Sequence, residues 1–305
     1  MSSPVKKLAI HSRDFNLTRM NLRLAFIFAL ALAFNFSPAN AADTNLLVGF
    51  CTADFAAAKA AGFDFAEARI REFVKLSDDD FVKFAARCHT NGLPLLTGYW
   101  LFPADMKVVG PNVHMDEVTN YLEKAFTRCE KLGVKTIVFG SGDARRSPDG
   151  FAKEKAFEQL VALGKFMAVA AQKHGLLIVA EPLRRAEANT INSVTEGLAW
   201  VEAVNHPNFE LLVDIYHMTE ENEDAAIIVK AGAHIRHVHL ANPRGRVLPL
   251  NAAEFDYTPF FRALNQIGYH GTISIETKAV NLAVDGPKAI QFTRTAFAAA
   301  GKPAK

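Results

Sequence analysis

The fold is decided by Leu176-Leu177-Ile178-Val179-Ala180-Glu181 and by three similar runs that follow it. The other three are Phe209-Glu210-Leu211-Leu212-Val213-Asp214, Ile235-Arg236-His237-Val238-His239-Leu240 and Thr272-Ile273-Ser274-Ile275-Glu276. Each run is short, largely apolar, and ends on or near a polar group. Runs of this kind, separated by longer amphipathic stretches, are typical of buried parallel strands covered by helices. The stretch 176–277 is therefore predicted to contain four strands of one parallel sheet.

The same alternation covers the chain upstream of residue 176. Four further apolar runs complete a set of eight predicted strands, at 46–50, 63–70, 93–97 and 135–139. Helices are predicted at 53–61, 77–90, 115–132, 150–174, 194–204, 224–231, 256–267 and 286–299. Eight strands and eight helices in strict alternation predict a closed (β/α)8 TIM barrel, an α/β fold of roughly 250 residues. We therefore expect residues 42–305 to form a single TIM-barrel domain.

The first 41 residues have the features of a secretory signal peptide with an upstream extension. Basic residues precede an apolar run at 24–36, which leads to the small-residue site Ala39-Asn40-Ala41. This arrangement marks a cleavable signal, and the run is shorter than the ~20 residues of a transmembrane helix. We expect cleavage near Ala41 and an exported protein, periplasmic or secreted. An uncleaved membrane anchor is the alternative.

Composition and charge limit the classes of partner. The chain has 305 residues, half of them hydrophobic, and a formal net charge of +2. So small a charge gives no reason to expect binding to nucleic acid or to an anionic membrane surface. We therefore expect no nucleic-acid partner and no stable membrane association after signal cleavage.

The chain has only three cysteines, Cys51, Cys88 and Cys129. An odd and low count does not form a disulfide framework. We expect buried, unpaired thiols. Because export permits oxidation, one bridge between Cys88 and Cys129 is the alternative.

Four candidate metal ligands lie at or near the carboxyl ends of the last four predicted strands, and they are Glu181, Asp214, His239 and Glu276. Chemistry in a (β/α)8 barrel takes place at this end, and consecutive strands are neighbours in the ring, so the four side chains can converge. Three carboxylates and one imidazole suit one divalent ion, Mn²⁺ first, with Mg²⁺ or Co²⁺ as alternatives. Of the two histidines on the seventh strand, we expect His239 to point into the barrel and His237 to face the helices.

Three motifs resemble those of a known family. They are Glu181-Pro182-Leu183-Arg184-Arg185-Ala186-Glu187, Asp214-Ile215-Tyr216-His217-Met218 and His237-Val238-His239. With these motifs, the segment 46–299 resembles the xylose isomerase-like TIM barrels known as sugar phosphate isomerases/epimerases. Ketose 3-epimerases and hydroxypyruvate isomerases are the members that it resembles most.

The resemblance implies roles for individual residues. Glu181 and Glu276 would be metal ligands and also the two catalytic carboxylates. Glu187 and His217 would contact the substrate. An arginine after the seventh strand would do the same; we assign Arg244, with Arg246 as the alternative because the spacing is not clean.

The function that follows is a divalent-metal-dependent sugar isomerase or epimerase. It would abstract a proton next to a carbonyl and pass through an enediolate stabilised by the metal ion. Export favours a free sugar, a keto-sugar or a glycoside as substrate over a sugar phosphate. The loop 241–246 departs from the family pattern, so an exported lyase that acts on 3-keto-glycosides by β-elimination is the alternative.

Three further points stay open in the sequence. A DNA-cleaving hydrolase on the same barrel would need more His ligands and a basic face, which the chain lacks. A sugar-binding protein without catalysis would not need four metal ligands. Barrels of this kind are commonly homo-oligomers, but no interface can be identified.

Overall fold

The computed structural model describes residues 46–278 and 281–302. The predicted signal peptide, residues 1–41, lies outside the described residues, so it stays a prediction. Across the described ranges, no helix is both long and apolar enough to cross a membrane.

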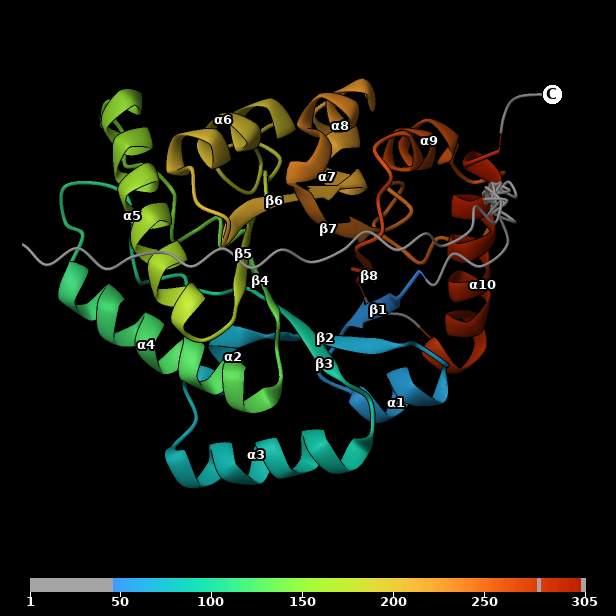
Figure 1. Ribbon diagram of the computed structural model, residues 1–305, viewed down its shortest axis with the longest axis horizontal. Helices are drawn as coiled ribbons and strands as arrows, with labels where there is room; N and C mark the ends of the chain where they lie inside the picture. Colours follow the sequence, from blue (N-terminus) through green and yellow to red (C-terminus); the bar gives the residue numbers. More distant parts are fainter. Residues whose placement is uncertain (1–45, 279–280, 303–305) are drawn as a thin grey trace, which may run out of the picture. The chain divides into compact units, whose positions relative to one another are not determined.

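Eight parallel strands form a closed barrel in which each strand pairs with its neighbours in sequence and β8 pairs with β1. The strands are β1 (Val48–Cys51), β2 (Phe65–Arg69), β3 (Leu95–Tyr99), β4 (Thr136–Phe139), β5 (Leu177–Ala180), β6 (Phe209–Asp214), β7 (Ile235–Leu240) and β8 (Thr272–Ile275). Figure 1 shows the strands at the centre with the helices outside them. The predicted (β/α)8 barrel is confirmed.

The described residues form ten α-helices, two more than predicted. They are α1 (Phe55–Ala60), α2 (Ile70–Val74), α3 (Asp78–Asn91), α4 (Met115–Leu132), α5 (Lys153–Lys173), α6 (Val194–Val204), α7 (Ile215–Glu220), α8 (Ala226–Ala231), α9 (Thr258–Gln266) and α10 (Leu282–Ala300). The expectation of eight helices in strict alternation was wrong, because α2 and α7 each follow a strand without a loop. Helices this short lack a readable apolar period.

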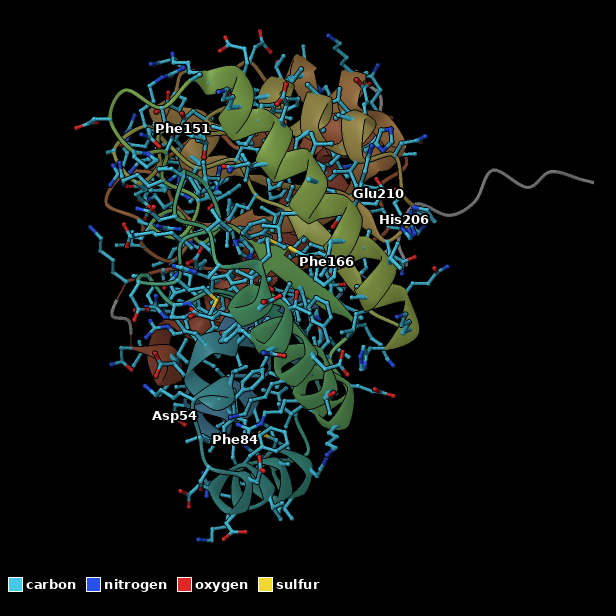
Figure 2. All side chains as sticks on the ribbon, turned by 90° about the vertical axis from the view of Figure 1, so that its left-hand side faces the viewer. Asp54, Phe84, Phe151, Phe166, His206 and Glu210 are labelled. Carbon is cyan, nitrogen blue, oxygen red and sulfur yellow. The ribbon has the colours of Figure 1, made fainter. Side chains whose placement is uncertain are left out.

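The helix ends follow the local signals in the sequence. The hydroxyl of Ser77 accepts a hydrogen bond from the backbone N–H of Asp80 and so caps α3. Gly92 ends the same helix in the left-handed region with φ 68°. Phe84 of α3 then packs on Phe55 and Phe73, at ring-centroid distances of 6.1 and 5.9 Å (Figure 2 labels Phe84).

A small apolar cluster fills the barrel interior. Its buried members come from five strands and are Cys51, Tyr99, Val138, Val179 and Leu212. β3 to β6 are consecutive in the ring, but β1 neighbours none of them, so Cys51 can meet the other four side chains only inside the ring. This cluster packs inside the same ring whose strand ends carry the candidate ligands.

All three cysteines are buried and free. The expectation of unpaired thiols is therefore confirmed. A bridge between Cys88 and Cys129, the alternative, is not formed.

Candidate active site

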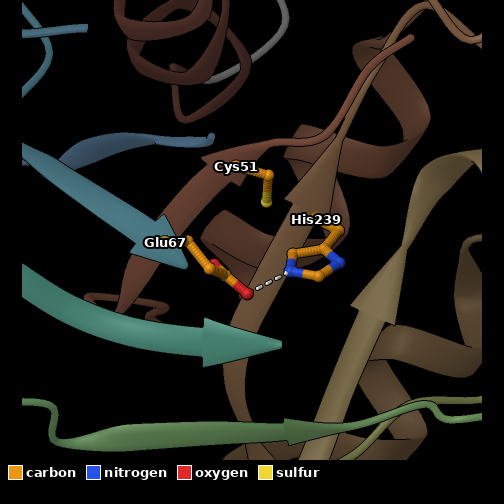
Figure 3. Close-up of side chains that lie close together, drawn as sticks. All are labelled: Cys51, Glu67 and His239. Carbon is orange, nitrogen blue, oxygen red and sulfur yellow. Dashed lines mark hydrogen bonds and ion pairs between the residues drawn. The ribbon is translucent and has the colours of Figure 1, made fainter. Parts of the chain in front are cut away.

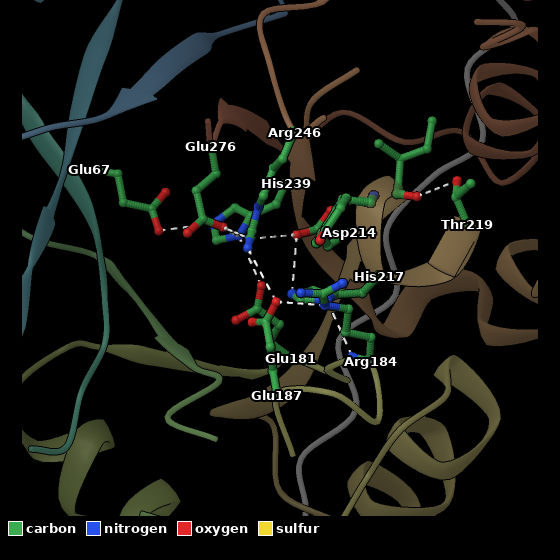
Figure 4. A network of polar contacts seen from close by, with 12 residues as sticks. Glu67, Glu181, Arg184, Glu187, Asp214, His217, Thr219, His239, Arg246 and Glu276 are labelled. Atoms are coloured by element: carbon green, nitrogen blue, oxygen red, sulfur yellow. Dashed lines mark hydrogen bonds and ion pairs between the residues drawn. The ribbon is translucent and has the colours of Figure 1, made fainter. Parts of the chain in front are cut away.

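The barrel brings the four predicted ligands together. Glu181 directly follows β5, Asp214 ends β6, His239 lies next to last in β7, and Glu276 directly follows β8. Each offers one ligand atom, and these atoms all lie within 4.8 Å of one another. Figure 4 shows them converging from neighbouring strands. The cause is topological, because parallel strands of one ring end at the same side.

The imidazole of His239 is the centre of this cluster. Its Nδ1 lies 3.0 Å from Oε1 of Glu181 and 3.2 Å from Oε2 of Glu276. Burial raises the pKa of Glu181, and burial also raises the pKa of Asp214 to about 7. Burial opposes ionisation of Glu276 too, but the hydrogen bond with His239 and the nearby positive charges lower its pKa to about 2. Three carboxylates side by side, two of them buried and Glu276 half-buried, repel one another unless a cation lies between them.

A second observation also supports a bound divalent ion: one carboxylate oxygen of Asp214 lacks a hydrogen bond. Oδ1 of Asp214 accepts from the backbone N–H of Tyr216 at 2.7 Å, but the buried Oδ2 has no hydrogen-bond partner within residues 46–278 and 281–302. Arg246 forms an ion pair with Oδ2, at 3.5 Å, without a hydrogen bond. Leaving a buried charged oxygen without a hydrogen bond is costly. A divalent ion held by these oxygens and one imidazole nitrogen would satisfy it.

A cavity of about 390 Å³ opens above the four residues. Its wall includes the sequence-predicted residues Glu181, Glu187, His217 and Glu276, together with Arg246. The cavity is therefore the place where a substrate would meet the carboxylates.

His217 is held as a neutral donor. Its Nδ1 accepts from the backbone N–H of Arg184 at 3.2 Å. Burial, with the charge of Arg246, lowers the pKa of His217 to about 3, so the ring is uncharged near neutral pH. The proton therefore belongs on Nε2, which is buried, without a hydrogen-bond partner among the described residues, and 3.6 Å from Oδ2 of Asp214. His217 can donate this proton to a substrate oxygen.

Glu187 lies at the rim of the cavity. Its Oε1 lies 2.8 Å from Nε of Arg184 and 3.7 Å from Nη1 of Arg246. These two ion pairs fix the carboxylate in place while leaving it a third exposed. It is therefore available to a hydroxyl group of a ligand.

Of the two arginines considered for substrate contact, the structure places Arg246, the alternative, in the cavity wall, and Arg244 does not line it. Arg244 is exposed. Nη2 of Arg246 lies 2.7 Å from Oε2 of Glu276. The backbones of Asn242 and Val247 pair with each other, and Arg246 takes the left-handed region at φ 54°, so the loop turns its side chain back over the strand ends.

His237 does not face the helices, and that expectation was also wrong. Its Nε2 lies 3.0 Å from Oε2 of Glu67, which is on β2 across the barrel from β7. Residues two apart on a strand point to the same side, so His237 must share the interior with His239.

Glu67 is the site residue that the sequence analysis missed. It is completely buried in the middle of β2 and lies 3.0 Å from His239 Nε2. A carboxylate inside an apolar strand run is the one signal that was available. Nothing in the sequence indicates which groups face it across a barrel.

The aromatic segment after β3 forms part of the cavity wall. Trp100 and Phe102 both line it, and Arg71 lies over the Trp100 ring at 4.1 Å. The turn after β4 faces them, and Ser141 Oγ accepts from the backbone N–H of Phe102 at 3.1 Å. Trp100 and Phe102 therefore give the cavity an apolar wall on this side.

The family comparison agrees with this geometry. Residues 55–296 match the family model described as xylose isomerase-like TIM barrel. That segment includes every residue of the candidate site.

Relatives and solved structures extend the comparison. An L-ribulose 3-epimerase of Methylomonas sp. (strain DH-1) is 30% identical over 73% of this chain and 76% of its own length. A D-psicose 3-epimerase of Ruminiclostridium cellulolyticum (strain ATCC 35319 / DSM 5812 / JCM 6584 / H10) is 26% identical over 70% of this chain and 74% of its own length. The fold matches the D-allulose 3-epimerase from Methylomonas sp. in complex with D-allulose, with a TM-score of 0.71, 24% identity, and coverage of 82% of this chain and 96% of that one.

Proposed function

The chain belongs to the xylose isomerase-like TIM barrel family, and on that premise we propose that it epimerises a free ketose at the carbon next to the carbonyl, with the help of one divalent ion. At the coarser level it is an isomerase or epimerase that acts on a carbohydrate, as its relatives are. The position of two carboxylates carries the finer proposal. Glu181 from the end of β5 and Glu276 from the end of β8 both line the cavity, and β6 and β7 separate their strands.

Two carboxylates that reach a cavity from different strands can serve the two faces of one carbon. One removes the proton beside the carbonyl, and the other returns a proton to the same carbon from the opposite face. Ion pairing with His239 and Arg246 lowers the pKa of Glu276, whereas burial raises that of Glu181. The two therefore differ in basicity, which suits one acid and one base.

A divalent ion held by Glu181, Asp214, His239 and Glu276 would supply Lewis-acid stabilisation of the charge that develops on the carbonyl oxygen. Mn²⁺ is our first candidate, with Mg²⁺ or Co²⁺ as alternatives. The remaining site residues bind and orient the sugar. His217 donates from Nε2, Arg246 offers a positive charge beside Glu276, and Glu187 accepts from a hydroxyl group.

The test is an incubation in D₂O with Mn²⁺ and a free ketose such as D-allulose or L-ribulose. We expect the 3-epimer to form with one deuterium at C3, measured by mass spectrometry and by NMR after removal of the protein and the metal. Glu181→Gln and Glu276→Gln should each abolish the exchange. Full activity in either variant, or release of the aglycone from a 3-keto-glycoside in place of epimerisation, would contradict the proposal.

Export is a second, separate proposal that rests only on residues 1–41. It places the enzyme where free sugars are more abundant than sugar phosphates. Mass spectrometry of the protein from an exporting host should find a mature N-terminus near residue 42. An intact N-terminus on a protein that stays in the cytoplasm would refute export and leave the catalytic proposal untouched.

A further inference from the structure

Glu67 occupies a position for which the proposed reaction has no direct use. It is fully buried in β2 and does not line the cavity. Its Oε1 lies 3.0 Å from Nε2 of His239, and its Oε2 lies 3.0 Å from Nε2 of His237 and 2.8 Å from the hydroxyl of Thr97. Figure 3 shows Glu67 and His239 facing each other across the barrel interior. Each oxygen of this carboxylate is thus already hydrogen-bonded.

The chemistry of these contacts assigns the hydrogens. Both oxygens of Glu67 face ring nitrogens, and Oε2 also accepts from the hydroxyl of Thr97. A carboxylate in this position accepts hydrogen bonds, so both imidazoles carry hydrogen on Nε2. The other nitrogen of His239, Nδ1, lies 3.0 and 3.2 Å from oxygens of Glu181 and Glu276. At these distances Nδ1 either carries hydrogen and donates to the carboxylates or offers its lone pair to a cation held among them.

We propose that Glu67 is a positioning residue for the metal site: by accepting from Nε2 of His239, it fixes the ring so that Nδ1 is the atom offered to the divalent ion. The inference rests on the metal dependence of the proposed function and goes beyond it. A carboxylate that holds the second nitrogen of a ligating histidine raises the basicity of the ligand and keeps the ring in one orientation.

The hydrogen-bond network that holds Glu67 continues beyond its second oxygen. His237 faces its second oxygen, and Nδ1 of His237 lies 2.7 Å from the hydroxyl of Thr272 on β8. The partners therefore come from β2, β3, β7 and β8, which are themselves fixed by the ladder of the closed barrel. Such a carboxylate has little freedom to turn away from His239.

A competing role for Glu67 is direct ligation. Cys51, Glu67 and His239 also offer atoms within 4.8 Å of one another (Figure 3). In that role Glu67 would give up at least one of its hydrogen bonds, and His239 would need a second free nitrogen. Neither Cys51 nor Glu67 reaches the cavity. The positioning role requires none of these changes, and the two roles predict different numbers of bound ions.

The test compares three variants of the mature full chain. Glu67→Leu removes the acceptor. Glu67→Gln keeps the shape of the side chain. Ser274→Ala is the matched control, because Ser274 is buried beside His239 in the β7–β8 register and its hydroxyl has no hydrogen-bond partner among the described residues.

Two readouts are needed. Electron paramagnetic resonance of free Mn²⁺ gives the dissociation constant and the number of ions bound. Nitrogen-15 NMR of the protein loaded with diamagnetic Mg²⁺ shows which ring nitrogen of each histidine carries hydrogen. We expect wild type and Ser274→Ala to bind one ion with His239 protonated on Nε2. In Glu67→Leu, Nε2 of His239 loses its acceptor, so its nitrogen-15 shift should change and the dissociation constant should rise by roughly 10–100-fold.

Several outcomes would overturn the inference. One is a folded Glu67→Leu variant with unchanged Mn²⁺ affinity. Another is a wild-type chain that binds two ions, the second of which is lost in Glu67→Leu and in Cys51→Ser. If Glu67→Leu does not fold, Glu67→Gln decides. A change in Mn²⁺ affinity without a change in the His239 ring, or the reverse, would contradict the positioning role. If wild type binds no Mn²⁺, the proposed metal dependence is overturned as well. If wild type and Glu67→Leu each bind one ion with the same affinity, the positioning role alone is overturned.

Discussion

Replacing Gly140 by alanine is a sharp test of the place assigned to Glu181. Gly140 follows β4, and a Cβ built on it would lie 2.2 Å from Oε2 of Glu181 and 3.3 Å from Cδ of the same residue. Because ordinary non-bonded contacts between heavy atoms are about 3.5 Å, the carboxylate would have to move by roughly 1 Å. A misplacement of ~1 Å at a catalytic group costs about 10²-fold in rate. We therefore expect kcat/KM for the ketose to fall about 10²-fold in Gly140→Ala.

The assay measures initial epimerisation rates, Mn²⁺ affinity and thermal unfolding of the metal-free protein side by side. The displaced atom is the end of a side chain, so we expect the unfolding temperature to change little. Gly175→Ala is the matched control with the opposite signature. Gly175 has φ +64° and no atom within 4 Å of a built Cβ, so alanine should cost about 1 kcal/mol of stability and leave the rate unchanged. Gly140→Ala with full kcat/KM and unchanged Mn²⁺ affinity would refute the role of Glu181.

Three further predictions follow from the site. Arg246→Leu should raise KM by at least about 10-fold, because a charged contact is lost, whereas the exposed Arg244→Leu should leave KM unchanged in initial-rate measurements; the reverse order would contradict the loop structure. Because the pKa of Asp214 is raised to about 7, Mn²⁺ affinity should fall as the pH drops from 8 to 6, whereas the free energy of unfolding of the metal-free protein should rise by about 1 kcal/mol. Asp214→Asn should flatten both pH profiles, and an unchanged slope would exclude this residue as the source. Arg145 is completely buried and donates to the backbone carbonyls of Gly140 and Glu181, so Arg145→Met should lower the free energy of unfolding in urea by about 3 kcal/mol, and a loss below about 1 kcal/mol would show that these carbonyls find other partners.

The strands and the convergence of the four candidate ligands were predictable because two simple rules act on this sequence. Near-continuous apolar runs between amphipathic helices predict a parallel barrel. In such a barrel every strand ends on the same side, so Glu181 and Asp214 had to be neighbours once their strands were recognised. Neither step depends on the path of a loop.

The loop after β7 shows where this approach ends. Arg244 and Arg246 are two residues apart, and only the turn that pairs Asn242 with Val247 decides which of them enters the cavity. Backbone turns of this kind depend on the surroundings as much as on local sequence. The sequence alone therefore left the choice between Arg244 and Arg246 open.

The error on His237 has a different origin. The period of a strand places His237 and His239 on the same side, so the correct position was readable from the sequence. The partner of both rings was not readable, because Glu67 lies on β2, far away in sequence and separated from β7 in the ring by β8 and β1. Contacts across a barrel are set by strand register and tilt, which no single run encodes.

The most direct measurement of the central claim is an anomalous difference map from crystals of the protein soaked in Mn²⁺. The account predicts a single peak inside the barrel mouth, ligated by carboxylate oxygens of Glu181, Asp214 and Glu276 and by Nδ1 of His239, with Glu67 still hydrogen-bonded to Nε2. A peak bound instead by Cys51 and Glu67, or no peak at these strand ends under conditions in which the enzyme is active, would contradict it.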